Sequence, residues 1–421
     1  MLLSKRVQGI ILISLSSIAL ILIAILASGA FIKAAEPAVE VAGASLQIGA
    51  GEATTTTPPT TTTAAPTTTT PPPLRTATLA FTGDTLAHRG VVRQAKAYAA
   101  DSELDYDFAP MYRLVEPYLS AADVAICHLE TPLSIDNRNL SGYPVFNVPH
   151  ELADGLAAAG YDGCSTASNH SLDRRPSGVF DTIDVLEGAG LQQTGMFRSA
   201  EERAEPTIYD AAGIAVAHLS YSYGFNGFTE PGDKPWLVNE IDIDQITADA
   251  AAARASGAEY VVVSLHWGIE YRIAPSSEQL EVGPAVLEID DVDVIIGHHA
   301  HVVQPVGKVD DKFVVYGLGN FLSNQSANCC VAASQDGVIV QVHIQERRAA
   351  EATDPGFRTW LSYVPTWVDR DDFTIVPVVE ALEDEELSDG RQATLEKSRA
   401  RTNDAIGGLG ARGWGVLEAL R

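Results

Sequence analysis

From about residue 74 onward, short apolar runs rich in β-branched residues alternate with segments of helical character. The apolar runs predict strands over residues 76–84, 124–130, 163–168, 214–220, 260–268, 292–299 and 312–321. The segments between them predict helices over about 107–119, 151–159, 177–190, 242–256 and 277–289. Alternation of this kind is typical of an α/β domain.

The pattern continues to about residue 350 without a second linker, so we expect one domain of catalytic size over residues 76–350. Residues 351–421 are expected to form a C-terminal extension packed on that domain. From Val379 the extension reads VEALEDEELSDG, which predicts a peripheral, acidic helical segment.

The first part of the chain has a different pattern. An uncharged apolar stretch from about Gly9 to Ile32 follows Lys5 and Arg6, and it is long enough to cross roughly 30 Å of hydrocarbon. We therefore expect residues 1–33 to be a transmembrane signal anchor, with a single-pass protein in the cell membrane and its domain outside the cytoplasm. The alternative is a cleaved signal peptide and a secreted protein. Residues 34–75 contain a run of Thr, Pro and Ala and are expected to be a disordered linker.

The chain is strongly acidic, with a formal net charge of −27 over 421 residues. A surface of this sign repels nucleic acid, so we expect no nucleic-acid partner. The four cysteines fit an oxidising compartment, where a disulfide is an option. We expect Cys127 and Cys164 to be neighbours in the sheet as two buried thiols, because directly paired strands rarely satisfy disulfide geometry. Cys329 and Cys330 lie in a predicted loop and are the pair expected to oxidise more readily.

Polar residues gather where the predicted strands end. In open α/β sheets that edge binds ligands. The residues concerned are Asp84, Glu130, Asn169, His170, His266 and the histidines of GHHAH at 298, 299 and 301. They offer carboxylate oxygen, amide oxygen and imidazole nitrogen, a mixture that suits Mn, Fe or Zn. No cysteine belongs to these motifs, and ligands spread over several strands fit a hydrolytic centre with two divalent ions about 3.5–4 Å apart.

Six motifs carry a family resemblance: FTGDTLAHRGV, HLETPLS, ASNHSLDRRPSG, HWGIEY, GHHAHVVQPV and YGLGNFLSNQ. In this order, from about Ala77 to His343, they resemble the CapA-type capsule (poly-γ-glutamate) synthesis family, which is similar to the calcineurin-like metallophosphoesterases. The resemblance implies a four-layer sandwich, in which two β-sheets are flanked by helices. It also implies capsule biosynthesis with capsule-synthesis membrane partners.

The resemblance implies a role for each site residue. The implied metal ligands are Asp84, Glu130, Asn169, His266 and two of the three clustered histidines. His170 would donate a proton to the leaving group, and Asp173 could orient its ring by accepting the other N–H. The residues expected to line the pocket are His298, Arg175, Tyr271, Gln304 and Asn320.

The choice among the three histidines stays open at this point. Spacing selects His299 and His301, whereas the preceding glycine points to His298; we favour the first pair, with His298 facing the opposite way. His128 stands where the family usually has Asn, so an extra imidazole could approach the site.

Two functions fit these features. The first is a metal-dependent hydrolase acting on an anionic polymer or a phosphoester. The second is a non-catalytic component of an envelope machine, in which the same metal site binds an anionic polymer during assembly or export.

Overall fold

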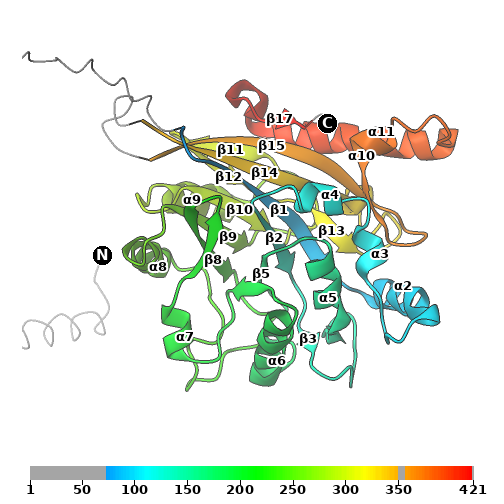
Figure 1. Cartoon of the computed structure of the whole chain (residues 1–421), viewed down its shortest axis with the longest axis horizontal. Coiled ribbons are helices and arrows are strands. Elements are labelled where there is room, and N and C mark those ends of the chain that lie inside the picture. Colours follow the sequence, from blue (N-terminus) through cyan, green and yellow to red (C-terminus); the bar gives the residue numbers. More distant parts are fainter. Residues whose placement is uncertain (1–72, 349–355, 420–421) are drawn as a thin grey trace, which may run out of the picture. The chain divides into compact units, whose positions relative to one another are not determined.

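The computed structural model describes residues 73–348 and 356–419 (Figure 1). The predicted anchor at 1–33 and nearly all of the predicted linker at 34–75 lie outside these residues. Within the described residues no helix is both long and apolar enough to cross a bilayer. The expectation of a single-pass membrane protein is therefore corrected, because this finding does not support a membrane anchor.

The larger sheet has a parallel half and an antiparallel half. Its strand order is β16-β15-β14-β1-β2-β5-β6. The parallel half consists of β1 (Thr76–Leu86), β2 (Val124–Leu129), β5 (Gly163–Ser165) and β6 (Gln192–Thr194), with β13 (Asn320–Ser323) beside β1. The antiparallel half consists of β14 (Asp336–Glu346), β15 (Phe357–Val368) and β16 (Ile375–Pro377), and β17 (Leu417–Glu418) pairs with β15.

The second sheet has the order β11-β12-β10-β9-β8-β7. Its parallel centre is formed by β8 (Ile214–Ser222), β9 (Tyr260–His266), β10 (Val294–His298) and β12 (Lys312–Val315). The antiparallel strands β7 (Thr207–Ala211) and β11 (Val306–Val309) form its edges. A small separate pair joins β3 (Leu133–Ser134) to β4 (Val148–Pro149).

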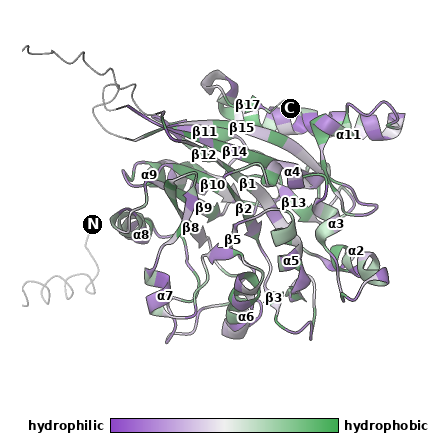
Figure 2. Ribbon diagram, viewed as in Figure 1, coloured by the Kyte–Doolittle hydropathy of each residue, from purple (hydrophilic) through white to green (hydrophobic). Residues whose placement is uncertain are grey.

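Alternation along the strands decides how the sheets pack. In β1, Leu79 and Phe81 join a core cluster with Val262 and Ile296 of the second sheet, whereas Ala80 faces a cluster of helical residues. The inner faces of the two sheets therefore pack against each other, and Figure 2 shows much of the central strands in green, the colour of hydrophobic residues.

Helices cover both outer faces. The larger sheet is covered by α2 (Arg89–Tyr98), α3 (Ala109–Tyr112), α4 (Glu116–Leu119) and α5 (Glu151–Ala158). The second sheet is covered by α8 (Ile243–Ala255) and α9 (Ser277–Leu287), whose Val286 and Leu287 are buried against it. The helix α6 (Arg175–Gly188) follows the loop that contains His170, and the short helix α7 (Ala200–Ala204) follows β6. The predicted α/β class is confirmed.

The C-terminal segment is part of the larger sheet as well as a helical layer. β15 pairs with the whole length of β14: Trp367 lies opposite Asp336 at one end, and Phe357 lies opposite Glu346 at the other. The segment therefore contributes a full-length strand. The predicted helical tail appears as α10 (Val378–Ala381) and the mostly polar α11 (Asp389–Ile406), which lies along β14 and β15. Arg401 of α11 reaches the buried carboxylate of Asp336 at 2.7 Å.

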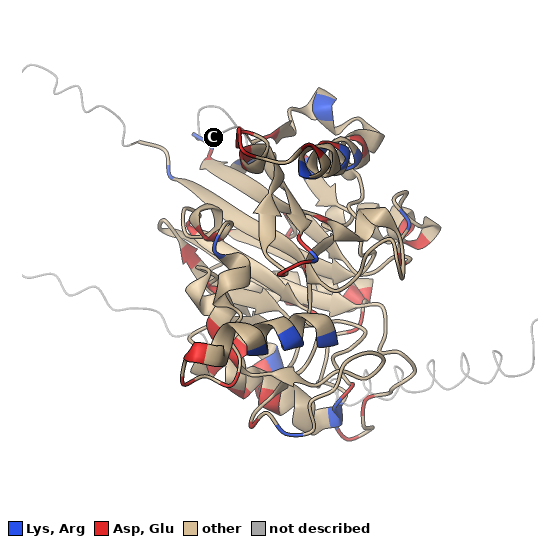
Figure 3. Ribbon diagram, turned by 90° about the vertical axis from the view of Figure 1, so that its right-hand side faces the viewer, with Lys and Arg blue, Asp and Glu red and all other residues tan. Residues whose placement is uncertain are grey.

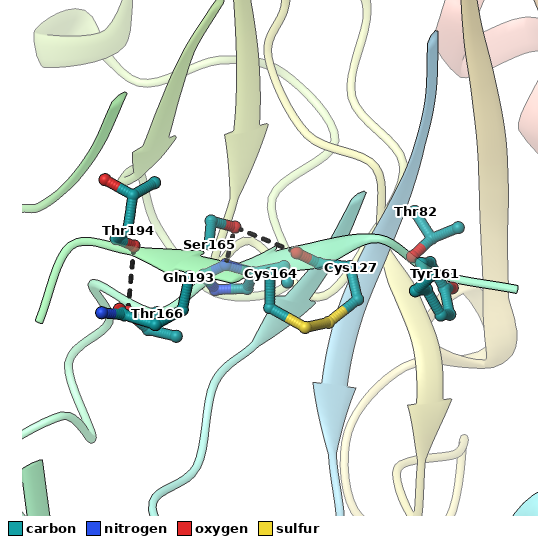
Figure 4. The surroundings of a disulfide bond; sticks show 9 residues. Thr82, Cys127, Tyr161, Cys164, Ser165, Thr166, Gln193 and Thr194 are labelled. Carbon is teal, nitrogen blue, oxygen red and sulfur yellow. Dashed lines mark hydrogen bonds between the residues drawn. A yellow bond between two sulfur atoms is a disulfide. The ribbon is translucent and has the colours of Figure 1, made fainter. Parts of the chain in front are cut away.

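Cys127 and Cys164 form a disulfide (Figure 4). They are register partners in the neighbouring strands β2 and β5, so the prediction that they are neighbours is confirmed. The prediction of two free thiols is wrong, because the Cα atoms lie only 4.4 Å apart and both side chains face the same helix-covered core, within bridging reach. Cys329 and Cys330 are free.

Candidate metal centre

The strand ends of both sheets deliver polar side chains to one place. Asp84 of β1 is the register partner of His128 in β2, and His266 of β9 is the partner of His298 in β10. Glu130 follows β2 directly. Since parallel strands end at one edge, the two sheets together place these residues around a common buried space.

Two glycines allow the backbone to approach closely there. A Cβ at Gly83 would lie 2.1 Å from the carbonyl oxygen of Gly319, and one at Gly297 would lie 2.0 Å from that of Tyr316. A side chain at Gly83 would push β1, which carries Asp84, away from Gly319, and one at Gly297 would push β10, which carries His298, away from Tyr316. The close packing therefore requires glycine at both positions.

The chain bends sharply after β10. His299 has φ of 86° and His301 has φ of 54°. This left-handed backbone costs an L-residue roughly 1–2 kcal/mol and occurs where a function requires it. The bend ends the strand alternation, so all three histidines face the same space. The expectation that His298 faces the opposite way is wrong, because its Nδ1 lies 3.5 Å from Asp84 Oδ1 and its ring stacks on His128 at 4.0 Å.

Within the described part of the chain, the candidate ligand atoms form four overlapping groups, of which the two considered first share no residue. Asp84, His128 and His298 form the first, and Glu130, His266 and His299 form the second, with the ligand atoms of each group within 4.8 Å of one another. His301 lies between them. Its Nδ1 is 2.9 Å from Asp84 Oδ2, and its Nε2 is 3.7 Å from Glu130 Oε1. These groups could hold a metal ion.

Hydrogen bonds connect the groups and orient the rings. His128 Nε2 lies 2.9 Å from His266 Nδ1, and His128 Nδ1 lies 2.8 Å from Ser165 Oγ. Asn169 Oδ1 lies 3.1 Å from His266 Nε2, which places the amide oxygen at the edge of the second group. Its amide nitrogen donates to Asn226 Oδ1 at 3.3 Å.

Several atoms of the centre lack any hydrogen-bond partner although they are buried. Both carboxylate oxygens of Glu130, both ring nitrogens of His298 and Nδ1 of His299 are in this state. A buried polar atom without a partner costs about 1–3 kcal/mol, and more when charged. Oxygen and imidazole donors at this spacing fit a divalent cation, which would satisfy them together.

Burial controls the protonation of the imidazoles. It lowers the pKa of His299 to about 3 and those of His128 and His266 well below their ordinary value. These rings are therefore neutral at pH 7, the form in which imidazole binds a metal. Burial alone would also lower the pKa of His301, but the charges of Glu130 and Asp84 raise it to about 9.

The two carboxylates differ in environment. Burial raises the pKa of Glu130 well above its ordinary value. Burial would also raise that of Asp84, but its contacts with His298 and His301 lower the pKa well below the usual range. Asp84 therefore remains an anion beside the histidines, and Glu130 lacks a comparable set of donors.

His170 and Asp173 form a buried pair at the edge of the centre. His170 Nδ1 lies 2.8 Å from Asp173 Oδ2, which also accepts the N–H of Phe146 at 2.6 Å. The His170 ring packs edge-on against Phe146 with centroids 4.7 Å apart. The sequence prediction that Asp173 lies in position to orient His170 matches this geometry.

The residues predicted to line a pocket occupy different places. Tyr271 lies 6.0 Å from His301, ring to ring, whereas Arg175 is exposed and stacks over the Phe228 ring at 4.5 Å. Gln304 uses its amide to hold the loop before α9, donating to Arg272 O at 2.8 Å and accepting from Gln279.

Asn320 is buried directly beside Asp84, its register partner across β13 and β1. Its amide nitrogen donates to Ser334 O at 2.8 Å, and its Oδ1 has no partner. The roles assigned to these pocket residues stay predictions.

Four residues of the centre were outside the predicted set. His128 belongs to the first ligand group, and its position before the Leu-Glu pair was the visible signal. Glu270 groups with His299 and His301 and lies in the quoted HWGIEY motif. Tyr223 packs its ring 4.7 Å from His299, and Asn226 contacts Asn169. Both follow β8 in a loop whose sequence shows no metal-site pattern.

The fold and site define an α/β protein with a buried His/Asp/Glu centre between two packed sheets. The family model for the bacterial capsule synthesis protein PGA_cap matches residues 78–325. The chain belongs to this family, as its CapA-type motifs predict.

Named relatives agree. The chain is 26% identical over 281 residues to the capsule biosynthesis protein CapA of Bacillus anthracis, covering 65% of each protein. It is 25% identical over 274 residues to the PGA biosynthesis protein CapA of Bacillus subtilis (strain 168), covering 63% of this chain and 67% of that one. The chain thus spans about two thirds of the length of these relatives.

Among solved structures, the calcineurin-like phosphoesterase YfkN from Bacillus subtilis matches with a TM-score of 0.39 and 12% identity. The match covers 79% of this chain and 98% of that one.

Proposed function

We propose that this protein is a metal-dependent hydrolase of capsule or poly-γ-glutamate biosynthesis that cleaves a bond in an anionic substrate. The proposal includes two divalent ions, Mn, Fe or Zn, and a relationship to the calcineurin-like phosphoesterases. Support comes from membership of the PGA_cap family, the two ligand groups and the adjacent His170–Asp173 pair.

The observation that carries the proposal is Glu130. Its side chain is fully buried and neither carboxylate oxygen has a hydrogen-bond partner. Among the described residues, the basic side chain that lies near it is His301, at 3.7 Å. Removing a carboxylate from water without partners costs several kcal/mol. A divalent cation shared with His266 and His299 offsets that cost, which explains why a buried site keeps an acid here.

Asp84, His128 and His298 would hold one ion, and Glu130, His266 and His299 would hold the other. When bound, the ions supply Lewis-acid activation of water and neutralise charge on the substrate. Asn169 orients His266 through its 3.1 Å contact. His301 donates to Asp84 and lies between the two groups.

His170 has the arrangement of a proton donor. With Nδ1–H donated to Asp173, Nε2 is the atom that can carry a proton to the leaving group. Asp173 is held in place by the Phe146 N–H, so the ring direction is fixed before substrate binds. The Phe146 ring packed against His170 limits access of water to it.

The test combines metal analysis with turnover. The purified chain should carry stoichiometric divalent metal and cleave either model phosphoesters or γ-glutamyl oligomers. His170→Asn should keep the metal and lose at least about 100-fold in turnover, the range of one general acid. His150→Asn, a half-exposed histidine outside both ligand groups, is the matched control and should retain both.

Stoichiometric metal without turnover on either substrate class would contradict the hydrolase and favour a polymer-binding component. Equal turnover in His170→Asn and the parent would remove His170 from the chemistry.

A further inference from the structure

A cavity of about 250 Å³ lies beside α2, away from the ligand groups. One side is formed by α2 with Arg89, Arg93 and Lys96, and the other by the loop around residues 140–149 and Tyr106. None of the ten lining residues is acidic. In a chain with 55 acidic and 28 basic residues, a cavity with three cations and no carboxylate is a marked local reversal of charge.

The three cations have no partners within the described part of the chain. Elsewhere, Arg75, Arg198 and Arg254 each lie 2.6–2.8 Å from a carboxylate oxygen. No ion pair or side-chain hydrogen bond joins Arg89, Arg93 or Lys96 to another described residue, and all three are exposed. Figure 3 faces this side of the molecule, and basic residues mark the helix at its front.

This arrangement has a cost for the helix. Arg89 and Arg93 are four residues apart and Arg93 and Lys96 three apart, so like charges are neighbours on one face. Each such pair destabilises a helix. Lys96 in the last turn gains from the helix dipole, but Arg89 in the first turn does not, so an anion bound along this face would relieve the repulsion.

The spacing and the walls describe that anion. From Arg89 to Lys96 the helix rises about 10 Å, at about 1.5 Å per residue, which suits successive charges along a chain better than one small ion. Val92, Leu140 and Pro149 line the same cavity with apolar surface. A ligand that fills it therefore carries several anionic groups separated by methylene groups, as a polycarboxylate does and a polyphosphate does not.

The cavity and the His170–Asp173 pair are both contacted by the loop that contains Phe146 and Asn147. Asn147 lines the cavity, and the preceding Phe146 donates its N–H to Asp173 and packs against His170. On its other side the Phe146 ring contacts His88, the residue before α2, with centroids 5.3 Å apart. A chain held along α2 would lie next to the loop that positions the His170–Asp173 pair.

We propose that the α2 cavity is a binding site for a stretch of a linear polycarboxylate, separate from the metal centre. This proposal deepens the proposed function. It rests on that function only where the bound stretch is identified as part of the substrate. Arg89, Arg93 and Lys96 bind the carboxylates, and the apolar wall packs on the methylene groups between them.

The test measures binding of a short fluorescent oligoglutamate to the full chain by anisotropy, with chelator present so that the metal centre does not contribute. Arg93→Glu with Lys96→Glu should weaken binding by at least about tenfold. The control, Arg358→Glu with Lys397→Glu, makes the same change of net charge at exposed positions outside the cavity and should bind like the parent.

The neutral pair Arg93→Gln with Lys96→Gln gives a second, milder variant, expected to weaken binding several-fold with an unchanged circular dichroism spectrum. Unlabelled polyphosphate should compete poorly. Equal weakening in the control, no weakening in either α2 variant, or equal competition by polyphosphate would overturn the proposal. A failure of the hydrolase would instead leave chelator-resistant binding intact and abolish only turnover.

Discussion

Without metal the Glu130→Gln variant should be at least as stable as the parent protein. With metal the parent should be the more stable of the two. The substitution keeps the shape of the side chain and removes its charge from a fully buried position without hydrogen-bond partners. In chelator the variant should therefore be at least as stable as the parent, because burial of Glu130 in the parent requires either an unpartnered charge or, since burial raises its pKa, uptake of a proton.

With metal the order should reverse. An ion at about 100 times its Kd stabilises the parent by about 2.7 kcal/mol if it binds only the folded state. Loss of a ligand should weaken affinity by at least about 100-fold, given that even outer contacts contribute 10–100-fold. The gain in the variant would then fall to about 0.4 kcal/mol, so about 2.3 kcal/mol of metal-dependent stability should disappear.

Urea unfolding followed by tryptophan fluorescence, with chelator and with Mn²⁺ or Zn²⁺, measures all four values. Asp336→Asn is the control, since Asp336 is also buried but is bonded to Ser398 and Arg401. It should lose about 1–3 kcal/mol in both conditions and keep its full gain from metal. An equal metal-dependent gain in Glu130→Gln and the parent would refute the reasoning.

Three further outcomes are expected. His298→Ala should lose as much bound metal as His301→Ala, measured by elemental analysis of the purified proteins, because both side chains contact Asp84; full occupancy in the first variant alone would remove His298 from the ligand set. Replacing both disulfide cysteines by serine should cost up to about 4 kcal/mol of unfolding free energy for a loop of this length, in a urea titration compared with the oxidised parent. Burial raises the pKa of Asp336 against the opposing charge of Arg401. The Arg401→Ala substitution should raise the pKa of Asp336 further above its value in the unfolded chain. The folded variant then binds more protons than the unfolded one, so the stability of the variant should fall more steeply than that of the parent between about pH 4 and pH 7, as measured by urea titrations. Parallel pH profiles would contradict this.

Much of the fold is predictable because local pattern and packing agree. Each of the seven predicted strands lies on an observed strand, and helices α5, α6, α8 and α9 begin within two residues of their predicted starts. The long strands β14 and β15 are not predicted. β15 contains Pro365, a residue type that argues against the interior of a strand. The neighbouring strand β14 is recognisable mainly because it pairs with β15.

Some features of the candidate site could also be predicted from the sequence, and others could not. Asp84, Glu130 and His266 come together because parallel strand ends meet, which sequence order alone can indicate. It could not be predicted that all three histidines face one space, because this depends on left-handed backbone at His299 and His301, which is uncommon in residues other than glycine. Tertiary packing imposes that bend. The disulfide likewise depended on a Cα separation that only the folded sheet defines.

The two ligand groups draw on both sheets, and this has a consequence for assembly of the protein. Asp84 and Glu130 come from the larger sheet, whereas His266 and His298 come from the second. Neither sheet alone contains all members of either of these two groups, so a folding intermediate with only one sheet formed has neither of them. Metal binding to these groups would then follow docking of the sheets, and a bound ion would crosslink the two layers.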